Sequence, residues 1–468
     1  MKMNGNVKKC SSSCFSCNCK SSSPPPPHVL VVTYPTQGHI NPLLQFSKRL
    51  VSKGDLKVTL AITLFVANSM KLPSTTNHSN IQIKTFSDGF DQMGSEQADT
   101  VEAYLNRFKI VGSQTLRDLI TKQQQQQQQL ICYCSSTSTA SSPPPPPPPP
   151  LRNGEFMAPF CCVIYDPFLP WALDVAKEFS LLGAPFFTQS CAVNSIYFHV
   201  QQGLLSVPLA TTAAGTVISL PGLPPMEVSD LPSFISDYES YPSVRYLVLN
   251  QFSNINKADW IFVNIFHMLE HEVVNWMSKL LPIRTIGPTV PSVYLDNRVE
   301  GDNDYGLNLF EPSRNTCIDW LNTKEIKSVV YVSFGSLAVL KAEQMEQLAW
   351  ALIGCNYNFL WVVRALELNK LPTNFSQQSS EKGLVVTWCP QLEVLCHQAL
   401  GCFTDIETCI REVMEGEKGE EIMRSANTWK ILAKEAVDKG GSSDSNIEEF
   451  VNTLQHSHAE KVDASDSA

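Results

Sequence analysis

Short apolar runs rich in β-branched residues recur along the first half of the chain, and segments of helical period separate them. Each run is continuously apolar, which is typical of a parallel strand covered on both faces. The runs are residues 28–33, 57–63, 81–86, 160–166 and 184–188. Strands that alternate with helices predict right-handed βαβ units and a parallel sheet.

A second series of the same kind begins near Cys317. It contains expected strands at 328–334, 359–363 and 384–387 and expected helices at 342–355, 405–440 (with a break at 417–419) and 446–454. Two series in 468 residues predict an α/β protein of two Rossmann-like domains. We expect a first domain at 28–280, a linker at 281–316, a second domain at 317–440, and a C-terminal helix and tail at 441–468.

Two segments are predicted to lie outside the folded domains. Residues 1–27 are rich in Ser, Cys and Lys and end in four prolines, so we expect a disordered extension. Its Cys14, Cys17 and Cys19 could suggest a metal site, but no His accompanies them, so we expect no metal. The low-complexity insert 121–155 contains a Gln run at 123–129 and a Pro run at 143–150, and we expect an exposed surface loop.

The amino-acid composition limits which partners and which cellular compartment we expect for the protein. The net charge is −10 and no basic cluster occurs, which argues against nucleic acid and anionic membranes as partners. No apolar run reaches the ~18 residues of a membrane span, and the N-terminus has no apolar core of a secretory signal. Several of the 15 cysteines lie inside apolar strand patterns, which favours free thiols in a reducing cytoplasm.

Candidate chemistry follows two strands of the first domain. A turn at 34–40 carries His39, and Asn41 and Pro42 look like the N-cap and first position of a helix, so we expect His39 on the loop. Asp166 ends another strand. Carboxyl ends of parallel strands meet at one sheet edge, where a His can take a proton and an Asp can orient it. The alternatives are a structural histidine and a carboxylate that caps the helix after Pro167.

In the second domain, the expected strand 383–387 runs into Trp388, Cys389, Pro390 and Gln391. An indole at the carboxyl end of a strand could stack on a nucleobase, although packing in the core would also explain it. Ser336 follows Gly335 after an earlier strand and could contact phosphate or simply form a turn. No G-x-G-x-x-G follows the first strand, which argues against a dinucleotide-dependent oxidoreductase.

Residues 28–42, 165–171 and 388–403 closely resemble motifs of plant family-1 UDP-sugar glycosyltransferases, in particular those that glucosylate phenolics and small carboxylic acids. The resemblance implies two facing Rossmann-like domains (the GT-B fold) and inverting transfer of glucose from UDP-glucose to a hydroxyl or carboxylate of a small plant metabolite. It implies no cofactor besides this co-substrate, no metal, and a monomer. His39 would be the base and Asp166 its partner. Ser336, Trp388, Cys389 and Gln391 would bind the UDP-sugar, and we expect an acceptor pocket formed by Phe186, Phe187, Gln189 and Phe266.

The chain departs from the family pattern after Phe403. The family's signature continues with His-Cys-Gly-Trp-Asn-Ser, whereas Thr404-Asp405-Ile406-Glu407 follows here. The residues that hold the diphosphate and the sugar are therefore missing. Because a βαβ unit takes about 30 residues, we expect the second domain to lack an internal strand–helix–strand passage and the activity to be impaired. The alternatives are a homologue that only binds small aglycones and the product of an aberrant gene model.

Overall fold

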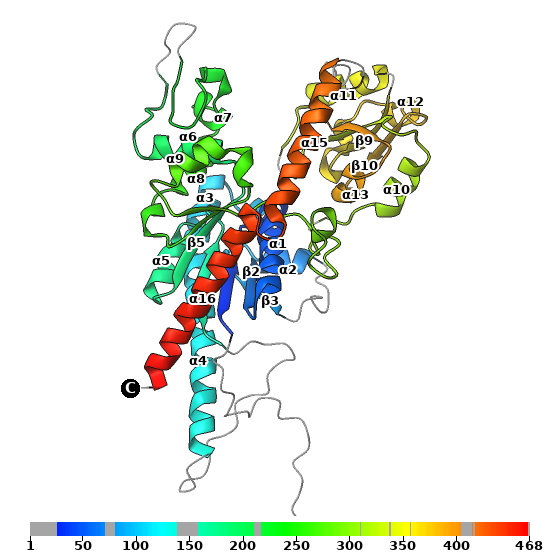
Figure 1. The fold of residues 1–468 in the computed structure, drawn as a ribbon. Coiled ribbons are helices and arrows are strands. Elements are labelled where there is room, and N and C mark those ends of the chain that lie inside the picture. The colour runs from blue at the N-terminus through cyan, green and yellow to red at the C-terminus, as the bar shows by residue number, and fades with distance from the viewer. Residues whose placement is uncertain are drawn as a thin grey trace, which may run out of the picture.

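Two parallel sheets, each covered by helices on both faces, organise the computed structural model of the chain (Figure 1). The structure describes residues 26–70, 80–137, 158–209, 217–308, 310–336, 338–355, 357–403, 414 and 417–466. The predicted N-terminal extension up to residue 25, with its cysteines, lies outside these residues. The proline-rich part of the predicted insert also lies outside them.

The first sheet has seven parallel strands among the described residues. In spatial order they are β3 (Ile81–Phe86), β2 (Lys57–Thr63), β1 (His28–Val32), β4 (Phe160–Tyr165), β5 (Leu182–Phe187), β6 (Ile261–Val263) and β7 (Ile283–Thr285). The helices of this domain are α1 (Gln37–Lys53), α2 (Leu64–Ser69), α3 (Val101–Arg107), α4 (Ser113–Thr137), α5 (Trp171–Glu178), α6 (Cys191–Gln201), α7 (Ser233–Ser236), α8 (Pro242–Asn250) and α9 (His271–Met277).

Alternate side chains of β1 enter two different cores. Val29 and Val31 pack with α1, whereas Leu30 and Val32 pack with residues of α3, α4 and α5. Successive side chains of a strand point to opposite faces of its sheet, so a continuously apolar strand fits a sheet covered on both sides. The carboxyl ends of β1 and β4 lie next to each other in this arrangement.

The predicted boundary of the first domain at residue 280 is too early, because strand β7 follows it. Ile283–Thr285 lies within the segment 281–316 that we predicted to be linker, yet it pairs with β6 and extends the first sheet. A strand of three residues is too short to show an apolar period. The connection to the second domain therefore starts after Thr285.

Helix α4 corrects the predicted loop. The helix continues through Gln123–Gln129 to Thr137, where we expected irregular structure. Leu116 and Ile120 fix its first turns in the core, and glutamine is a good helix former, so the helix extends into the Gln run. Gln123 is buried and donates a hydrogen bond to the Ala158 carbonyl at 3.1 Å.

The second sheet has four parallel strands among the described residues, in the order β10 (Gly383–Val386), β9 (Asn358–Val362), β8 (Val329–Ser333) and β11 (Leu400–Phe403). Its helices are α10 (Arg314–Asn322), α11 (Ala342–Gly354), α12 (Phe375–Gln378) and α13 (Gln391–Leu395). Strand β11 was not predicted. Its place at the edge of a small sheet agrees with the predicted loss of a strand–helix–strand passage after Phe403.

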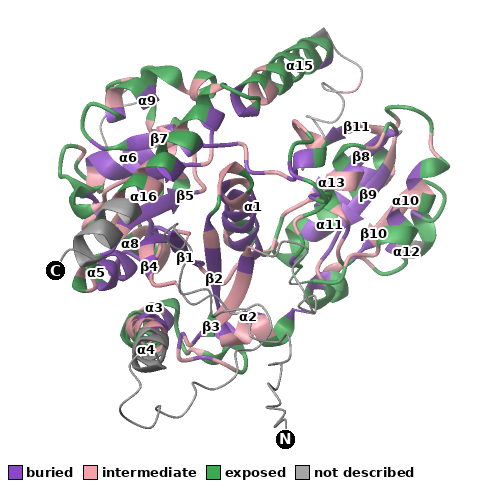
Figure 2. Cartoon of the chain, turned by 60° about the horizontal axis from the view of Figure 1, so that its bottom comes forward, coloured by how far each residue is buried: buried purple, intermediate pink, exposed green. Residues whose placement is uncertain are grey.

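Two long helices, α15 (Glu417–Val437) and α16 (Ser442–Asp466), return the chain to the first domain (Figure 1). The predicted helix break at 417–419 is wrong, because these residues form the first turn of α15, and 404–413 lie outside the described residues. Helix α16 buries Ile447, Phe450, Val451 and Leu454 in the first core. Most of α15 is exposed (Figure 2). No helix in the described part of the chain is long and apolar enough to cross a membrane.

Candidate active site

His39 and Asp166 form a direct pair at the carboxyl ends of β1 and β4. His39 Nδ1 lies 2.6 Å from Asp166 Oδ2, and the Asp166 side chain is fully buried. The other carboxylate oxygen accepts a hydrogen bond from the Phe168 backbone N–H at 3.0 Å. A carboxylate accepts the proton of Nδ1, so this contact fixes the tautomer with Nε2 as the free acceptor.

Helix α1 begins earlier than its sequence suggests. Its first residue is Gln37 and its N-cap is Thr36, so His39 lies in the first helical turn and not on the loop. Pro42, which we expected at the first helical position, lies inside the helix. The backbone N–H groups of His39 and Ile40 both donate to the Thr36 carbonyl at 3.0 Å. The first turn is thereby closed, and it holds the His39 ring rigidly over the sheet edge.

Aromatic side chains surround the His39–Asp166 pair. The rings of Phe168 and Tyr34 lie with centroids 4.9 and 5.5 Å from that of His39. Burial, and then the nearby carboxylates of Asp166 and Asp88, raise the pKa of Tyr34, which keeps its phenol neutral. The pair therefore lies among flat apolar surfaces that suit an aromatic substrate.

A cavity of about 220 Å³ lies where the two domains meet. Helix α1 contributes Gln37 and Asn41 to its wall, and the predicted donor-site residues Trp388, Cys389 and Gln391 line it from the second domain. The segment that connects the domains supplies the rest: Tyr294, Asn303, Asp304, Tyr305, Asn308, Pro312 and Arg314, next to Pro390, Leu392 and Glu393. The structure thus brings three of the four predicted donor residues together with the helix that carries His39.

Trp388 is half-buried and fixed by the connecting segment. Its ring lies 4.7 Å from the ring of Phe310, and its carbonyl accepts a hydrogen bond from the Ser313 N–H at 3.0 Å. The neighbouring Cys389 is buried with Sγ 3.3 Å from the Tyr331 hydroxyl, and burial raises the pKa of its thiol to about 11. A protonated buried thiol leaves the main chain of Cys389 as the part that can bind a ligand. Gln391, the first residue of α13, is exposed.

Ser336 lies on the loop after β8 and does not line this cavity. Gly335 before it has φ = 72°, a conformation that glycine adopts readily. Arg364, directly beyond β9, donates hydrogen bonds at 2.7 Å to the carbonyls of Ser336 and Ala338, and Glu367 pairs with its guanidinium. Sequence reasoning missed Arg364, although a lone arginine at the end of an apolar strand was a visible signal.

Two of the four predicted acceptor-pocket residues are buried in the hydrophobic cores. Phe186 is fully buried against Phe46 of α1, and Phe187 is stacked on Phe252 in a second core, so neither ring is open to a substrate. Both faces of β5 are covered, which buries consecutive side chains. Gln189 is half-buried and accepts from Gln251 at 3.2 Å, and Phe266 is buried beside Trp429 of α15.

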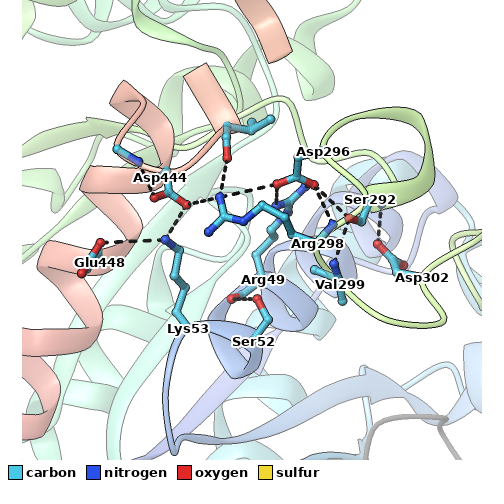
Figure 3. Close-up of polar contacts among 12 residues, drawn as sticks. Arg49, Ser52, Lys53, Ser292, Asp296, Arg298, Val299, Asp302, Asp444 and Glu448 are labelled. Atoms are coloured by element: carbon cyan, nitrogen blue, oxygen red, sulfur yellow. Dashed lines mark hydrogen bonds and ion pairs between the residues drawn. The ribbon is translucent and has the colours of Figure 1, made fainter. Parts of the chain in front are cut away.

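A network of ion pairs ties α1 to the connecting segment and to α16 (Figure 3). Arg49 forms a bidentate pair with Asp296, and Lys53 pairs with Asp444. Arg298 lies between the two carboxylates and donates to Asp444 at 3.0 Å. Asp296 and Asp444 are nearly fully buried. Burial alone would raise the pKa of each, but the paired cations lower it overall, so both carboxylates stay charged.

Among the described residues, no group of three or more His, Cys, Asp or Glu side chains is arranged to hold a metal ion. The arrangement instead offers an oriented histidine, a neighbouring cavity with one large aromatic wall, and several carboxamides around it. Carboxamides match the alternating donors and acceptors of a base edge, and an indole matches its flat face.

Comparisons with known proteins agree with this geometry. Residues 152–415 match the family model described as UDP-glucoronosyl and UDP-glucosyl transferase. The chain is 40% identical to mogroside I-E synthase of Siraitia grosvenorii and 38% identical to flavonol 7-O-beta-glucosyltransferase UGT74F1 of Arabidopsis thaliana, in each case over 92% of this chain and 98% of the relative. The solved structure of Os79 from O. sativa in complex with UDP covers 91% of this chain and all of its own, with a TM-score of 0.77 and 30% identity.

The alignment with mogroside I-E synthase also bears on the missing passage. It runs over 484 positions, more than the 468 residues of this chain, although it takes in 92% of them. Dozens of positions of that relative therefore have no counterpart here. This agrees with the small second sheet.

Proposed function

The chain belongs to the UDP-glycosyltransferase family, and from that premise we propose that it transfers glucose from UDP-glucose to a hydroxyl or carboxylate of a small plant metabolite, with inversion at the anomeric carbon. The observation that carries the proposal is the 2.6 Å contact between His39 Nδ1 and Asp166 Oδ2. His39 is on α1, and the same helix also lines the cavity beside Trp388. The first domain would bind the acceptor and the second the nucleotide sugar.

His39 is the proposed general base. Its Nε2 takes the proton of the acceptor hydroxyl, whose oxygen forms the new bond to the anomeric carbon. The bond from that carbon to the UDP oxygen breaks, and its electron pair leaves with the diphosphate. Asp166 keeps the proton on Nδ1 and stabilises the imidazolium that forms. A carboxylate acceptor is already ionised and would depend less on the base.

The lining of the cavity supports the proposed donor roles of Trp388, Cys389 and Gln391. Trp388 would stack on uracil, while the main chain of Cys389 and the amide of Gln391 would bind the base or ribose. Ser336 would contact phosphate from a loop that Arg364 holds by its carbonyls. We propose no cofactor besides UDP-glucose and no metal, as the resemblance to the family implies.

Gln189 and Phe266 remain the proposed acceptor-side residues. The relatives include a flavonol glucosyltransferase, and the aromatic rings around His39 suit a phenolic acceptor. A protein that only binds aglycones is not favoured, because relatives aligned over nearly the whole chain are named as enzymes. We further propose a monomer. We also propose a reducing cytoplasm, since Cys162, Cys317 and Cys402 are buried thiols that form no disulfide.

The test is UDP release from UDP-glucose in the presence of phenolic and carboxylic acceptors, with the glucoside identified by mass spectrometry. We expect acceptor-dependent UDP release that His39→Ala lowers by about 10²- to 10⁴-fold with phenolic acceptors and less with carboxylic acceptors. If a folded wild-type protein gives no glucoside with any acceptor, the proposed function is wrong. UDP binding by calorimetry, measured separately, shows whether the donor site is formed.

A further inference from the structure

A stripe of polar side chains runs along one buried face of α1. Gln37 Nε2 donates to the Leu307 carbonyl at 2.8 Å, and Gln45 Nε2 donates to the Asp304 carbonyl at 3.1 Å. Lys48 Nζ donates to the same Asp304 carbonyl at 2.9 Å. Residues four apart share a helix face, so the stripe binds the connecting segment to the helix that carries His39.

This stripe fixes the orientation of Asn41, the residue one turn after Gln37. The Leu307 carbonyl can only accept hydrogen bonds, so Gln37 must present its Nε2 atom to it. The same Nε2 lies 2.7 Å from Asn41 Oδ1. The carbonyl end of the Asn41 amide therefore faces Gln37, and its Nδ2 faces away.

Asn41 Nδ2 has no hydrogen-bond partner among the described residues. The residue is only 8% exposed, and it lines the cavity that Trp388 and Gln391 also line. Asn41 Nδ2 is not among the fully buried polar atoms that lack a partner, so this donor is open to the cavity and available to an oxygen there. A donor with a fixed direction on a cavity wall suits a ligand oxygen.

We propose that Asn41 belongs to the nucleotide-sugar site, where its Nδ2 donates to an oxygen of the ribose–diphosphate part of the donor, and that Gln37 is the positioning residue that orients it. This inference rests on the proposed function. Uracil on Trp388 marks one end of the donor, and the anomeric carbon near His39 marks the other. Asn41 is on the helix that carries His39 and lines the cavity beside Trp388, so it can reach the part between these two ends, where every exposed oxygen can accept a hydrogen bond.

Asn41→Asp is the sharpest variant, because it keeps an oxygen for Gln37 but replaces the donor with a carboxylate. Asn41→Leu removes the donor without adding charge, in case the first variant does not fold. We expect UDP binding, measured by calorimetry, to weaken about 10- to 100-fold in both. Asn194→Asp is the matched control, because Asn194 is also a buried asparagine, lies on α6 and does not line this cavity, so the UDP affinity of this variant should not change. The same titrations with uridine distinguish a ribose oxygen from a phosphate oxygen.

Gln37→Leu tests the positioning role. It should weaken UDP binding in the wild-type background and add nothing in the Asn41→Leu background, because a residue that acts through Asn41 has no effect once the amide is gone. If folded Asn41 variants bind UDP as tightly as the wild type, the proposed contact between Asn41 and the donor is wrong, whereas the proposed function still stands. Lack of UDP binding by the wild type would overturn both the contact and the proposed donor site, whereas UDP binding without glucoside formation would count only against the proposed function.

Discussion

His39 and Asp166 are 127 positions apart in the sequence, yet His39 Nδ1 lies 2.6 Å from Asp166 Oδ2. The pairing of β1 with β4 creates this contact, because the parallel strands end side by side. Phe168 holds the second carboxylate oxygen, so the Asp166 side chain cannot rotate without losing a hydrogen bond. A base oriented in this way serves proton removal from an acceptor.

Replacement of His39 by alanine should lower the turnover number by about 10²- to 10⁴-fold, which is the usual contribution of a general base. UDP affinity should not change, because His39 is not among the residues that line the donor cavity. Steady-state kinetics with a phenolic acceptor and UDP calorimetry measure the two effects. A variant with wild-type turnover would rule out His39 as the base.

Asp166→Asn tests the orienting role separately. Its amide nitrogen would face either His39 Nδ1 or the Phe168 N–H, and both positions now supply a donor. If the nitrogen faces the ring, the proton moves to Nε2 and the base is lost. We expect a loss of turnover comparable to that of His39→Ala, with the fold retained.

Trp388→Ala should weaken UDP binding about 5- to 150-fold, since stacking of a base on an aromatic ring contributes about 1–3 kcal/mol. Trp388→Phe keeps a flat face and should lose much less. Calorimetric titration of both variants with UDP checks the prediction. Equal affinities for the wild type and the alanine variant would show that the indole serves only to pack against Phe310.

His28 should make the protein less stable as the pH falls below neutrality. Burial lowers the pKa of its imidazole from 6.5 to about 4 in the folded protein. The unfolded chain therefore binds a proton between these values that the folded protein does not bind. The stabilisation is complete above pH 6.5 and is lost as the pH approaches 4, by about 3 kcal/mol in total.

Burial of the His28 ring outweighs its hydrogen bond to Ala158, which by itself raises the pKa. Nδ1 lies 2.7 Å from the Ala158 carbonyl, and Nε2 lies 2.7 Å from the Thr59 hydroxyl, so the neutral ring is already paired at both nitrogens. Urea unfolding at several pH values, for the wild type and for His28→Gln, isolates its contribution, because the other titrating groups are common to both. Parallel stability curves between pH 4 and 6.5 would contradict it.

Asp444→Ala should lower the free energy of unfolding by about 2–3 kcal/mol, a value between those of exposed and fully buried ion pairs. It removes the common partner of Lys53 and Arg298 (Figure 3). Glu448→Ala is the matched control on the same helix. Glu448 is 59% exposed and 3.9 Å from Lys53, so its loss should change stability by less than about 0.5 kcal/mol. If both variants lose a similar free energy of unfolding, the network stabilises the protein no more than a surface ion pair does.

Much of the first domain could be predicted because its strands are continuously apolar. Strands β2 and β3 have the predicted bounds, 57–63 and 81–86. The short strand β7 and the helical Gln run were missed, since three residues show no period and a homopolymer shows no apolar face. Helix α1 starts before its Asn-Pro signal because the Thr36 carbonyl accepts from the N–H groups of His39 and Ile40, although the Thr36 side chain forms no capping hydrogen bond, and Pro42 lies inside the helix.

Some residues of the candidate site could also be predicted from the sequence, and others could not. Residues at strand ends, such as His39 and Asp166, could be placed from the sequence because topology alone brings them together. The stripe on α1 could not, because Gln37, Asn41 and Gln45 look like ordinary polar positions of an amphipathic helix until the connecting segment is seen to cover them. Phe186 and Phe187 were misplaced for the opposite reason: an aromatic residue near a strand end has the same sequence pattern whether it faces a ligand or the core.

The return of α16 to the first domain has a consequence for biosynthesis. The core that β1 begins at residue 28 is closed by Ile447, Phe450 and Leu454. At about 5–20 residues per second, the ribosome needs on the order of 10 s or more between the last strand of the first sheet and α16. During that time an apolar face stays open while the second domain emerges. Nascent chains of this protein should therefore depend on chaperones that shield the first half until the last helix docks.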